Sequence, residues 1–291
     1  MPTLNKAEFL AEAVNSILNQ TYEDFELLVV DNGSSDSSVE IALSFAGSDS
    51  RVKLIREPRR GLSFALNAGI ANCKGRYVAL IGADDVYRKD KLQAQLKAID
   101  GNSRYSICHS DAWVMDRHGN PNGKLTHRDY VRVLETELTG NLFKRLLMRD
   151  LITGGTIMLL RECWEKERFD THLFFAEDWD MWVRLARSYE FLYIPEPLYG
   201  YRIYEGNSWG QGRERFVQSN HARAYEKWLR IFGDLEEDDR RSLIVSLSEC
   251  YADLRNVSAL GRLVLTNRAA MNYLSRRLRS SFLLRLERVL A

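Results

Sequence analysis

Phe25-Glu-Leu-Leu-Val-Val-Asp-Asn-Gly-Ser-Ser-Asp36 is the stretch that decides the fold, because a short apolar run is followed directly by a polar turn. The apolar residues at 25–30 predict a buried strand. The polar residues at 31–36 predict a turn that offers several N-caps to a helix near 39–45. A strand followed by a turn and a helix is the first part of a βαβ unit, which indicates an α/β protein.

The same alternation continues on both sides of this stretch. Upstream, apolar residues recur at helical spacing through residues 6–19. Downstream, the pattern predicts strands at 52–55 and 77–81 and helices at 62–73 and 89–99. Parallel neighbouring strands need crossover connections, so this order predicts a Rossmann-like, mixed and mostly parallel sheet flanked by helices.

The second half of the chain is more irregular before it becomes helical. The pattern predicts strands at 106–109, 112–115, 156–160, 191–194 and 198–204, and helices at 141–148 and 178–188. Beyond residue 211 only helical patterns follow. We therefore expect an α/β domain over residues 1–211 and a helical C-terminal extension over residues 212–291.

The chain opens with Met1-Pro-Thr-Leu-Asn5 directly before its first helix. An α/β fold of this kind normally starts with a buried strand, and these residues leave almost no room for one. Two explanations stay open: either the sequence is truncated or mis-started, or another segment fills that place.

Composition excludes several classes of protein. Of 291 residues, 45% are hydrophobic and 28% are charged, which is typical of a folded globular chain. A net charge of +1 gives no overall attraction to nucleic acid, so we expect no nucleic-acid partner. The four scattered cysteines form no C-x-x-C pair and fit neither a disulfide framework nor a zinc site. With no apolar run of ~20 residues and no signal peptide, we expect a cytoplasmic protein.

Acidic residues follow two of the predicted strands. Asp31 follows the strand at 25–30, and Asp84-Asp85 follows the strand at 77–81. Ligands of open α/β sheets bind at the carboxyl ends of strands, and carboxylates there can hold Mg²⁺ or Mn²⁺ on a substrate phosphate. One such Asp is more often a turn residue or N-cap. Two clusters together, with a third later, favour a binding site.

The third cluster is Ala176-Glu-Asp-Trp-Asp180 at the start of a predicted helix. Acidic residues suit a helix N-terminus, so capping explains part of it. Capping does not explain three carboxylates within four positions beside Trp179 and Trp182. Burial against aromatic side chains would raise the pKa of a carboxyl group and make it a better general base.

These stretches, with others in the same order, resemble the inverting nucleotide-sugar glycosyltransferases of family 2, which have the GT-A fold. The resemblance runs from residue 2 to about residue 208. The stretches that carry it are Pro2-Thr3 with Asn5, Ser16-Ile-Leu-Asn-Gln-Thr21, the opening stretch 25–36, Gly61-Leu-Ser63 with Asn67, Gly75-Arg-Tyr-Val-Ala-Leu80, Asp84-Asp85 with Lys91-Leu92, Glu177-Asp178 with Trp182 and Arg184, and Tyr201-Arg202.

The resemblance implies a role for each matched residue. Asp178 would be the catalytic base, and Glu177 would tune or orient it. Asp84 and Asp85 would hold Mn²⁺ or Mg²⁺ on the donor diphosphate. The nucleotide-sugar site would be formed by Thr3, Asn5, Asp31, Asn32, Asn67, Ala83, Asp84 and Arg202.

Two positions depart from the family pattern near the expected metal. Family members commonly have an acidic residue where this chain has Gly82, and often a His where it has Tyr204. Phenol is a poor ligand for Mg²⁺ or Mn²⁺ compared with carboxylate or imidazole. We therefore expect cation binding that is weak or that depends on the nucleotide.

Two functions stay open. The first is transfer of a single sugar from a UDP- or dTDP-sugar, with inversion, to a hydroxyl of a sugar or lipid-linked saccharide in polysaccharide or glycolipid biosynthesis. Single transfer is favoured because the Gln-x-x-Arg-Trp signature of processive synthases is absent. The second is a nucleotide-sugar-binding module with little or no turnover. A dehydrogenase is excluded because no Gly-x-Gly-x-x-Gly loop is present.

The last residues, 276–290, form a basic and amphipathic stretch. Such a helix can lie on an anionic membrane surface, which would place the protein at the inner face of the membrane beside a lipid-linked acceptor. The other interpretation is a helix that packs on the catalytic domain or joins a homodimer through the C-terminal helices, and we slightly favour it.

Overall fold

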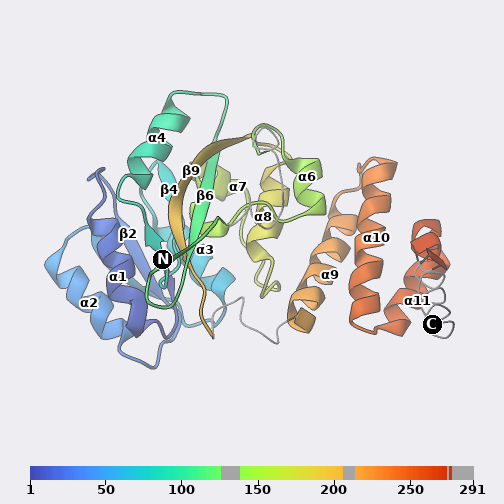
Figure 1. Ribbon diagram of the computed structural model, residues 1–291, viewed down its shortest axis with the longest axis horizontal. Helices are drawn as coiled ribbons and strands as arrows, with labels where there is room; N and C mark the ends of the chain where they lie inside the picture. The colour runs from blue at the N-terminus through green and yellow to red at the C-terminus, as the bar shows by residue number, and fades with distance from the viewer. Residues whose placement is uncertain (126–137, 206–213, 274, 277–291) are drawn as a thin grey trace. The chain divides into compact units, whose positions relative to one another are not determined.

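The computed structural model describes residues 1–125, 138–205, 214–273 and 275–276. It divides the chain into two compact units, Met1–Gly210 and Gln211–Ala291. The first unit is an α/β structure and the second is helical (Figure 1). The predicted α/β class is confirmed, and the candidate site lies in the first unit.

A small parallel sheet opens the first unit. Its order is β1-β2-β3, with β1 at Pro2–Thr3, β2 at Leu27–Asp31 and β3 at Val52–Arg56. The connections are the helices α1 (Ala7–Leu18) and α2 (Ser38–Ser48). Every residue of β2 is buried, as its apolar run predicts. Pro2 and Thr3 pair with Val30 and Asp31, so these two residues fill the place beside β2.

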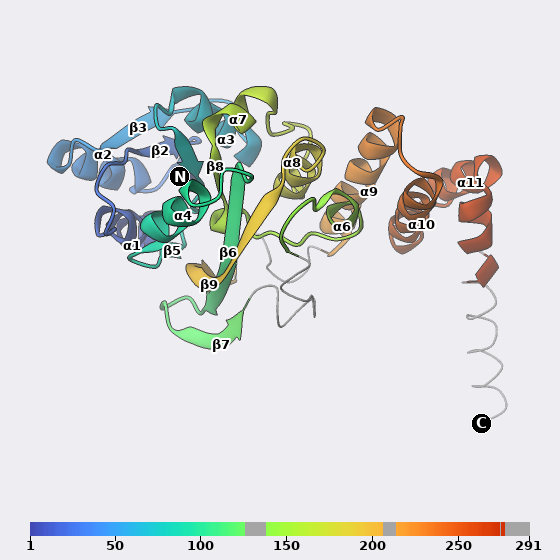
Figure 2. The same ribbon diagram turned by 90° about the horizontal axis from the view of Figure 1, so that it is seen from above.

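A larger mixed sheet follows, in the order β4-β8-β6-β9-β5, with β7 paired to β6. Among the strands that the structure describes here, only β6 and β9 pair in parallel, and they run side by side in both views (Figures 1 and 2). The other pairings in this sheet are antiparallel. The strands are β4 Tyr77–Ala79, β5 Val86–Tyr87, β6 Ile107–Met115, β7 Pro121–Leu125, β8 Met158–Leu160 and β9 Phe191–Arg202.

Helices connect and cover these strands. Their apolar faces supply much of the core: on α1, for example, Leu10, Val14 and Ile17 are buried. The other helices among the described residues of this unit are α3 Leu62–Asn72, α4 Lys91–Asp100, α6 Phe143–Met148, the 3₁₀ turn η2 Gly154–Thr156, α7 Arg161–Lys166 and α8 Glu177–Leu185.

The sequence pattern breaks β6 and β9 into two short strands each, and the structure makes each one continuous. The break in β9 falls at Pro195-Glu-Pro197, because proline has no N–H to donate to a ladder. In the structure the register jumps there, from Ser110 opposite Ile194 to Asp111 opposite Pro197. The extra residues bulge out of the pairing, and the strand continues beyond them.

A cavity of about 280 Å³ lies between the two sheets. Residues of β2 and of β4 line it, together with apolar residues of α3 and α4. Leu28, Val30 and Val78 are among the lining residues. None of the predicted site residues lines it, so this cavity is not the candidate site.

The second unit contains α9 (Glu214–Ile231), α10 (Glu237–Asp253) and α11 (Val257–Thr266). The side chains of Trp228 on α9 and Leu243 on α10 are fully buried. The amphipathic stretch at 276–290 lies outside the described residues, apart from Arg276. Among the described helices, none combines the length and apolar character needed to cross a bilayer.

The absence of a side chain at Gly200 allows β9 to lie between its neighbours β5 and β6. A Cβ at this position would lie 2.6 Å from the Trp113 ring and 2.7 Å from a Val86 methyl group. We therefore expect Gly200→Ala to destabilise the protein by roughly 1–3 kcal/mol in urea unfolding.

The control for this substitution is Gly47→Ala in α2, where a Cβ would meet no heavy atom within 4 Å. Alanine favours helix over glycine, so the control should stabilise by up to about 1 kcal/mol. Equal effects of the two substitutions would contradict the close packing at Gly200.

Candidate functional site

The carboxyl ends of β1 and β2 bring three predicted residues together. Thr3 pairs with Asp31, and Asn32 is the next residue of the chain. Asp31 accepts hydrogen bonds from the backbone N–H groups of Gly33 (3.2 Å) and Ser34 (3.0 Å), which fixes the polar turn. Thr3, Asp31 and Asn32 are all buried. Asp31, the first acidic residue of the polar turn, therefore stabilises the turn that the sequence predicts.

Asn32 ties the ends of three elements together. Its side-chain amide donates to the carbonyl oxygens of Glu57 (3.0 Å) and Arg59 (2.7 Å). Its side-chain oxygen accepts from the Gly61 N–H (2.8 Å) at the start of α3. Asn5 is the other predicted residue at this edge: its φ is 53°, and its side-chain oxygen accepts from the Ser35 N–H (2.8 Å).

The acidic loop, residues 82–85, follows β4 and is anchored by Asp85. One carboxylate oxygen of Asp85 accepts from the Tyr199 hydroxyl, and the other accepts from the Arg202 N–H (2.8 Å). Asp85 is buried, and burial, followed by the charge of Asp84, raises its pKa to about 7. The sequence predicts Asp85 as a metal ligand. In the structure, both of its carboxylate oxygens instead accept hydrogen bonds from residues of β9.

Asp84 points away from that anchor and stays partly exposed. Its Oδ2 accepts from the Lys6 ammonium (2.6 Å) and from the Tyr204 hydroxyl (2.8 Å). Lys6 also donates to the Tyr204 oxygen (2.5 Å), so the three polar groups form a triangle. We call these three residues the Lys6 triad. It joins the start of α1, the acidic loop and the segment after β9.

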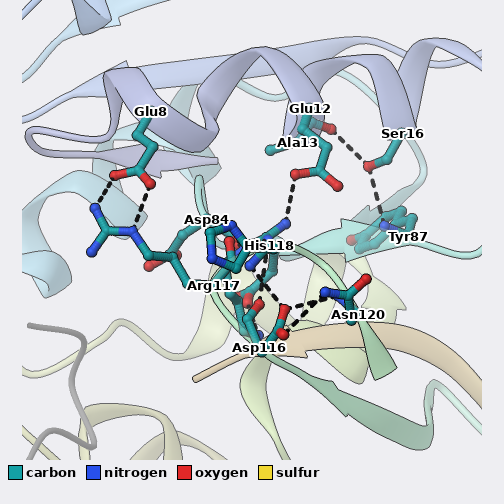
Figure 3. Close-up of polar contacts among 12 residues, drawn as sticks. Glu8, Glu12, Ala13, Ser16, Asp84, Tyr87, Asp116, Arg117, His118 and Asn120 are labelled. Carbon is teal, nitrogen blue, oxygen red and sulfur yellow. Dashed lines mark hydrogen bonds and ion pairs between the residues drawn. The ribbon is translucent and has the colours of Figure 1, made fainter. Parts of the chain in front are cut away.

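Arg202 is buried beneath the acidic loop. Its guanidinium donates to the carbonyl oxygens of Asp84 (2.7 Å) and Arg117 (2.8 Å) and pairs with Glu12 (2.6 Å). Figure 3 shows the neighbouring ion pair, in which Arg117 binds Glu8 on α1 (2.6 Å). The predicted role of Arg202 in donor binding stays a prediction, and these contacts make it a residue that positions Asp84.

The third acidic cluster lies at the N-terminus of α8, and its members have different environments. Asp180 forms a buried ion pair with Arg184 (2.9 Å), which is a structural contact. Glu177 is buried, and burial, followed by the charge of Asp178, raises its pKa to about 8. Burial also raises the pKa of Asp178.

Asp150, in the loop after α6, joins this cluster. Burial, followed by the charges of Asp178 and Glu177, raises its pKa well above the ordinary value. Like charges this close disfavour the ionised forms of one another, so Asp150, Glu177 and Asp178 cannot all lose their protons near neutral pH. An acidic cluster that retains protons at neutral pH is typical of sites where protons are transferred.

Contacts with η2 and β9 connect the cluster on α8 to the acidic loop. A Cβ at Gly154 would lie 3.2 Å from Asp178 Oδ2, and a Cβ at Gly155 would overlap the ring of Tyr199, which binds Asp85. Burial, followed by the charges of Asp85, Asp84 and Asp178, raises the pKa of Tyr201. Asp84 and Asp178 therefore both lie near enough to the Tyr201 phenol to raise its pKa.

The two remaining predicted residues lie in the framework around the site. The Asn67 amide donates to the Phe169 carbonyl (2.9 Å) and accepts from its N–H (3.0 Å), so α3 holds the segment that leads to α8. Ala83 is buried within the acidic loop. Trp179 and Trp182 are both buried in the core, which leaves neither available to stack on a sugar.

Sequence reasoning missed Lys6, Asp150 and Tyr199. Lys6 follows Asn5 directly in the opening residues, but no spacing connects it with Asp84, which is 78 positions away. Asp150 stands alone between a helix and a loop. Tyr199 and Tyr201 are two positions apart in β9, so both lie on the same face of the strand. This spacing is the one signal in the sequence that could have pointed to them.

Comparisons with known proteins point to one family. A family model described as glycosyl transferase family 2 matches residues 1–161. An uncharacterized glycosyltransferase of Rickettsia conorii is 27% identical over 209 residues, which cover 72% of this chain and 33% of that protein. The chain spans about a third of the length of the first curated relatives that it matches.

Solved structures share the fold. TarS of S. aureus in complex with UDP-GlcNAc has a TM-score of 0.66 at 18% identity, covering 90% of this chain and 79% of that one. A mannosyltransferase from Pyrobaculum calidifontis in complex with GDP-Man and Mn²⁺ has a TM-score of 0.65 at 18% identity, covering 97% and 79%. At this identity the likeness shows the fold alone, and the predicted GT-A type is confirmed.

The raised pKa of Glu177 predicts how stability depends on pH. Between about pH 4.5 and pH 8, unfolded Glu177 loses a proton that folded Glu177 retains, so the free energy of unfolding falls as pH rises. Glu177→Gln cannot titrate, and the stability that it gains over the wild type should grow across this window, to on the order of a few kcal/mol at pH 8.

Thermal unfolding of both proteins at pH 5, 6, 7 and 8 measures this difference. Glu40→Gln, at an exposed position of α2, serves as the control and should show a constant offset from the wild type. A constant offset for Glu177→Gln as well would show that Glu177 titrates at its ordinary pKa.

Proposed function

Because the chain belongs to glycosyltransferase family 2, we propose that it transfers a single sugar from a nucleotide-diphosphate sugar to an acceptor hydroxyl, with inversion at the anomeric carbon. One observation carries this proposal: Asp84 and Asp178, which are 94 positions apart in the sequence and both partly exposed, both contribute to raising the pKa of Tyr201. A donor diphosphate beside Asp84 then places its sugar toward Asp178.

The donor half of the site lies at the carboxyl ends of β1 and β2. We propose that Thr3, Asn5, Asp31 and Asn32 form the pocket for the base and ribose, where the chain is fixed by hydrogen bonds between the two strands and the polar turn. TarS binds UDP-GlcNAc and the mannosyltransferase binds GDP-Man. These ligands support a nucleotide-diphosphate sugar as the donor class, and we propose UDP or dTDP as the nucleotide.

Asp178 is the proposed base. Burial, followed by the charge of Asp178, raises the pKa of Glu177 to about 8, so Glu177 keeps its proton at neutral pH. The Asp178 carboxylate removes the proton of the acceptor hydroxyl as its oxygen attacks the anomeric carbon. The bond from that carbon to the diphosphate oxygen breaks on the opposite side, and one displacement inverts the centre. A raised pKa makes the carboxylate a stronger base for this step.

The expected divalent cation, Mn²⁺ or Mg²⁺ at Asp84 and Asp85, stays a prediction. Both Asp85 oxygens accept hydrogen bonds from β9, and Asp84 Oδ2 already contacts the Lys6 ammonium. In the described part of the chain, no three His, Cys, Asp or Glu side chains gather so that they could hold a metal ion. As they stand, these residues do not fit a divalent cation, and no step above is routed through one.

The acceptor and the cellular context are also proposals. We propose a sugar or lipid-linked saccharide as the acceptor, in polysaccharide or glycolipid synthesis at the cytoplasmic side of the membrane. Catalysis belongs to residues 1–211 in this scheme. The helical extension at 212–291 would serve contact with the membrane or with a second subunit.

A nucleotide-sugar-binding module without turnover is the second candidate. The Lys6 triad favours this candidate, because an enzyme that depends on a divalent cation would need Asp84 to be free of its contacts with Lys6 and Tyr204. The acidic cluster at α8 favours turnover, because a binding module has no use for three neighbouring carboxyl groups whose pKa values are all raised. Transfer activity decides between the two.

Asp178→Asn should lower the rate of transfer by on the order of 10²- to 10⁴-fold, because the amide cannot accept the proton. The affinity for the nucleoside diphosphate should change less than about threefold, since Asp178 lies on the acceptor side. Release of nucleoside diphosphate from a panel of UDP-, dTDP- and GDP-sugars, with simple saccharides as acceptors, measures the rate.

Two variants accompany this test. Glu177→Gln should lower the rate far less than Asp178→Asn, because Glu177 carries its proton at neutral pH. Asp90→Asn removes a carboxylate that pairs with Arg88 (2.6 Å) and should leave the rate unchanged. Undiminished transfer by Asp178→Asn would reject Asp178 as the base, and no transfer with any donor would favour the binding module.

A further inference from the structure

The Lys6 ammonium is held firmly at the edge of the donor site. The chain around it is fixed, because the Lys6 N–H donates to Ser38 Oγ (2.9 Å) and the Ala7 N–H donates to Asp36 (3.0 Å). Its side chain then reaches Asp84 and Tyr204, as described above. The Tyr204 ring packs on Phe9, with ring centroids 4.8 Å apart. The backbone at Lys6 is therefore fixed by Asp36 of the polar turn and by Ser38, the first residue of α2.

The ammonium stays charged and accessible. Burial lowers the pKa of Lys6, but the charge of Asp84 and the hydrogen bonds to Asp84 and Tyr204 outweigh burial, so the net pKa is raised. The side chains of Lys6 and Asp84 are 23% and 16% exposed, so a ligand can reach the pair. An ammonium has three N–H donors. Within the described residues two of them are used, and the third is open to a phosphate oxygen.

A divalent cation would have to displace this ammonium. A metal ion on Asp84 Oδ2 would lie beside a positive charge that is 2.6 Å from the same oxygen. Gly82 contributes no ligand, and a Cβ there would lie 3.1 Å from Asp84 Oδ1 and would overlap Asp85. The hydroxyl of Tyr204 is a poor metal ligand. The surroundings of Asp84 therefore suit an ammonium better than a metal ion.

We propose that Lys6 supplies the positive charge that binds the donor diphosphate beside Asp84, in place of a divalent cation. This inference rests on the proposed function, because it concerns the donor of that reaction. Lysine is a compact point charge that binds phosphate well. As the bond from the sugar to the diphosphate breaks, negative charge grows on the leaving oxygen, and a fixed ammonium stabilises it. Donor binding then needs no metal ion.

The test is binding of inorganic pyrophosphate, UDP, dTDP and GDP by calorimetry, with EDTA or with Mn²⁺. Wild-type protein should bind pyrophosphate and at least one nucleotide in EDTA, with a dissociation constant within about threefold of that in Mn²⁺. Lys6→Met should weaken binding in EDTA by roughly 10- to 100-fold, the usual range for one hydrogen bond to a charged group. In Lys6→Met, Mn²⁺ should restore part of the lost binding, because Asp84 no longer pairs with an ammonium and can hold the cation.

Two variants complete the test. Lys6→Arg keeps the charge and should retain most of the binding in EDTA. Lys53→Met removes a lysine–carboxylate pair of similar length on β3, 2.8 Å from Glu26, and should bind like the wild type. Thermal unfolding without ligand checks that each variant is folded.

The proposal is overturned if wild-type protein binds these ligands only with Mn²⁺, or if Lys6→Met binds as well as wild type in EDTA. Either result leaves Asp178 untouched as the base, because that assignment depends on the rate of transfer. Failure of every ligand to bind under both conditions overturns this inference and the nucleotide-sugar proposal together.

Discussion

Asp85 joins the acidic loop to β9 by accepting from the Tyr199 hydroxyl and the Arg202 N–H, and the rest of the site depends on this contact. A buried carboxylate is costly unless its oxygens are satisfied, and here both are. With Asp85 fixed, its neighbour Asp84 must point away from the core. Arg202 then holds the Asp84 carbonyl from below. The loop consequently presents one carboxylate to the outside and keeps the other as its anchor.

The two halves of the site are built by different means. The donor half is held by hydrogen bonds between backbone groups and side-chain amides, as Asn32 shows. Such a surface is rigid before any ligand arrives, which lowers the cost of binding. The half around α8 is instead strained electrostatically, because the buried Glu177 lies beside the half-buried Asp150 and Asp178, and the pKa values of all three are raised. Function at such a site is commonly obtained at the expense of stability.

The sequence predicts the elements better than it predicts their contacts. The apolar run before Asp31 predicts β2, because its five residues are buried on both faces. The prolines at 195 and 197 predict a break in β9, and a bulge absorbs them instead. The Lys6 triad was beyond prediction, since its members are separated by 78 and 120 positions. Periodicity is a local property, whereas loop contacts depend on how whole elements pack.

The continuous strand β9 also restricts which changes of chain length the site can accept. Tyr199 and Tyr201 lie on one face of the strand, so an insertion or deletion of a single residue before them would turn both to the opposite face. The anchor of Asp85 and the phenol between the two acidic groups would then be lost at once. Length variants that arise during evolution are therefore expected in the loops around the strand, and new acceptor preferences would have to come from there.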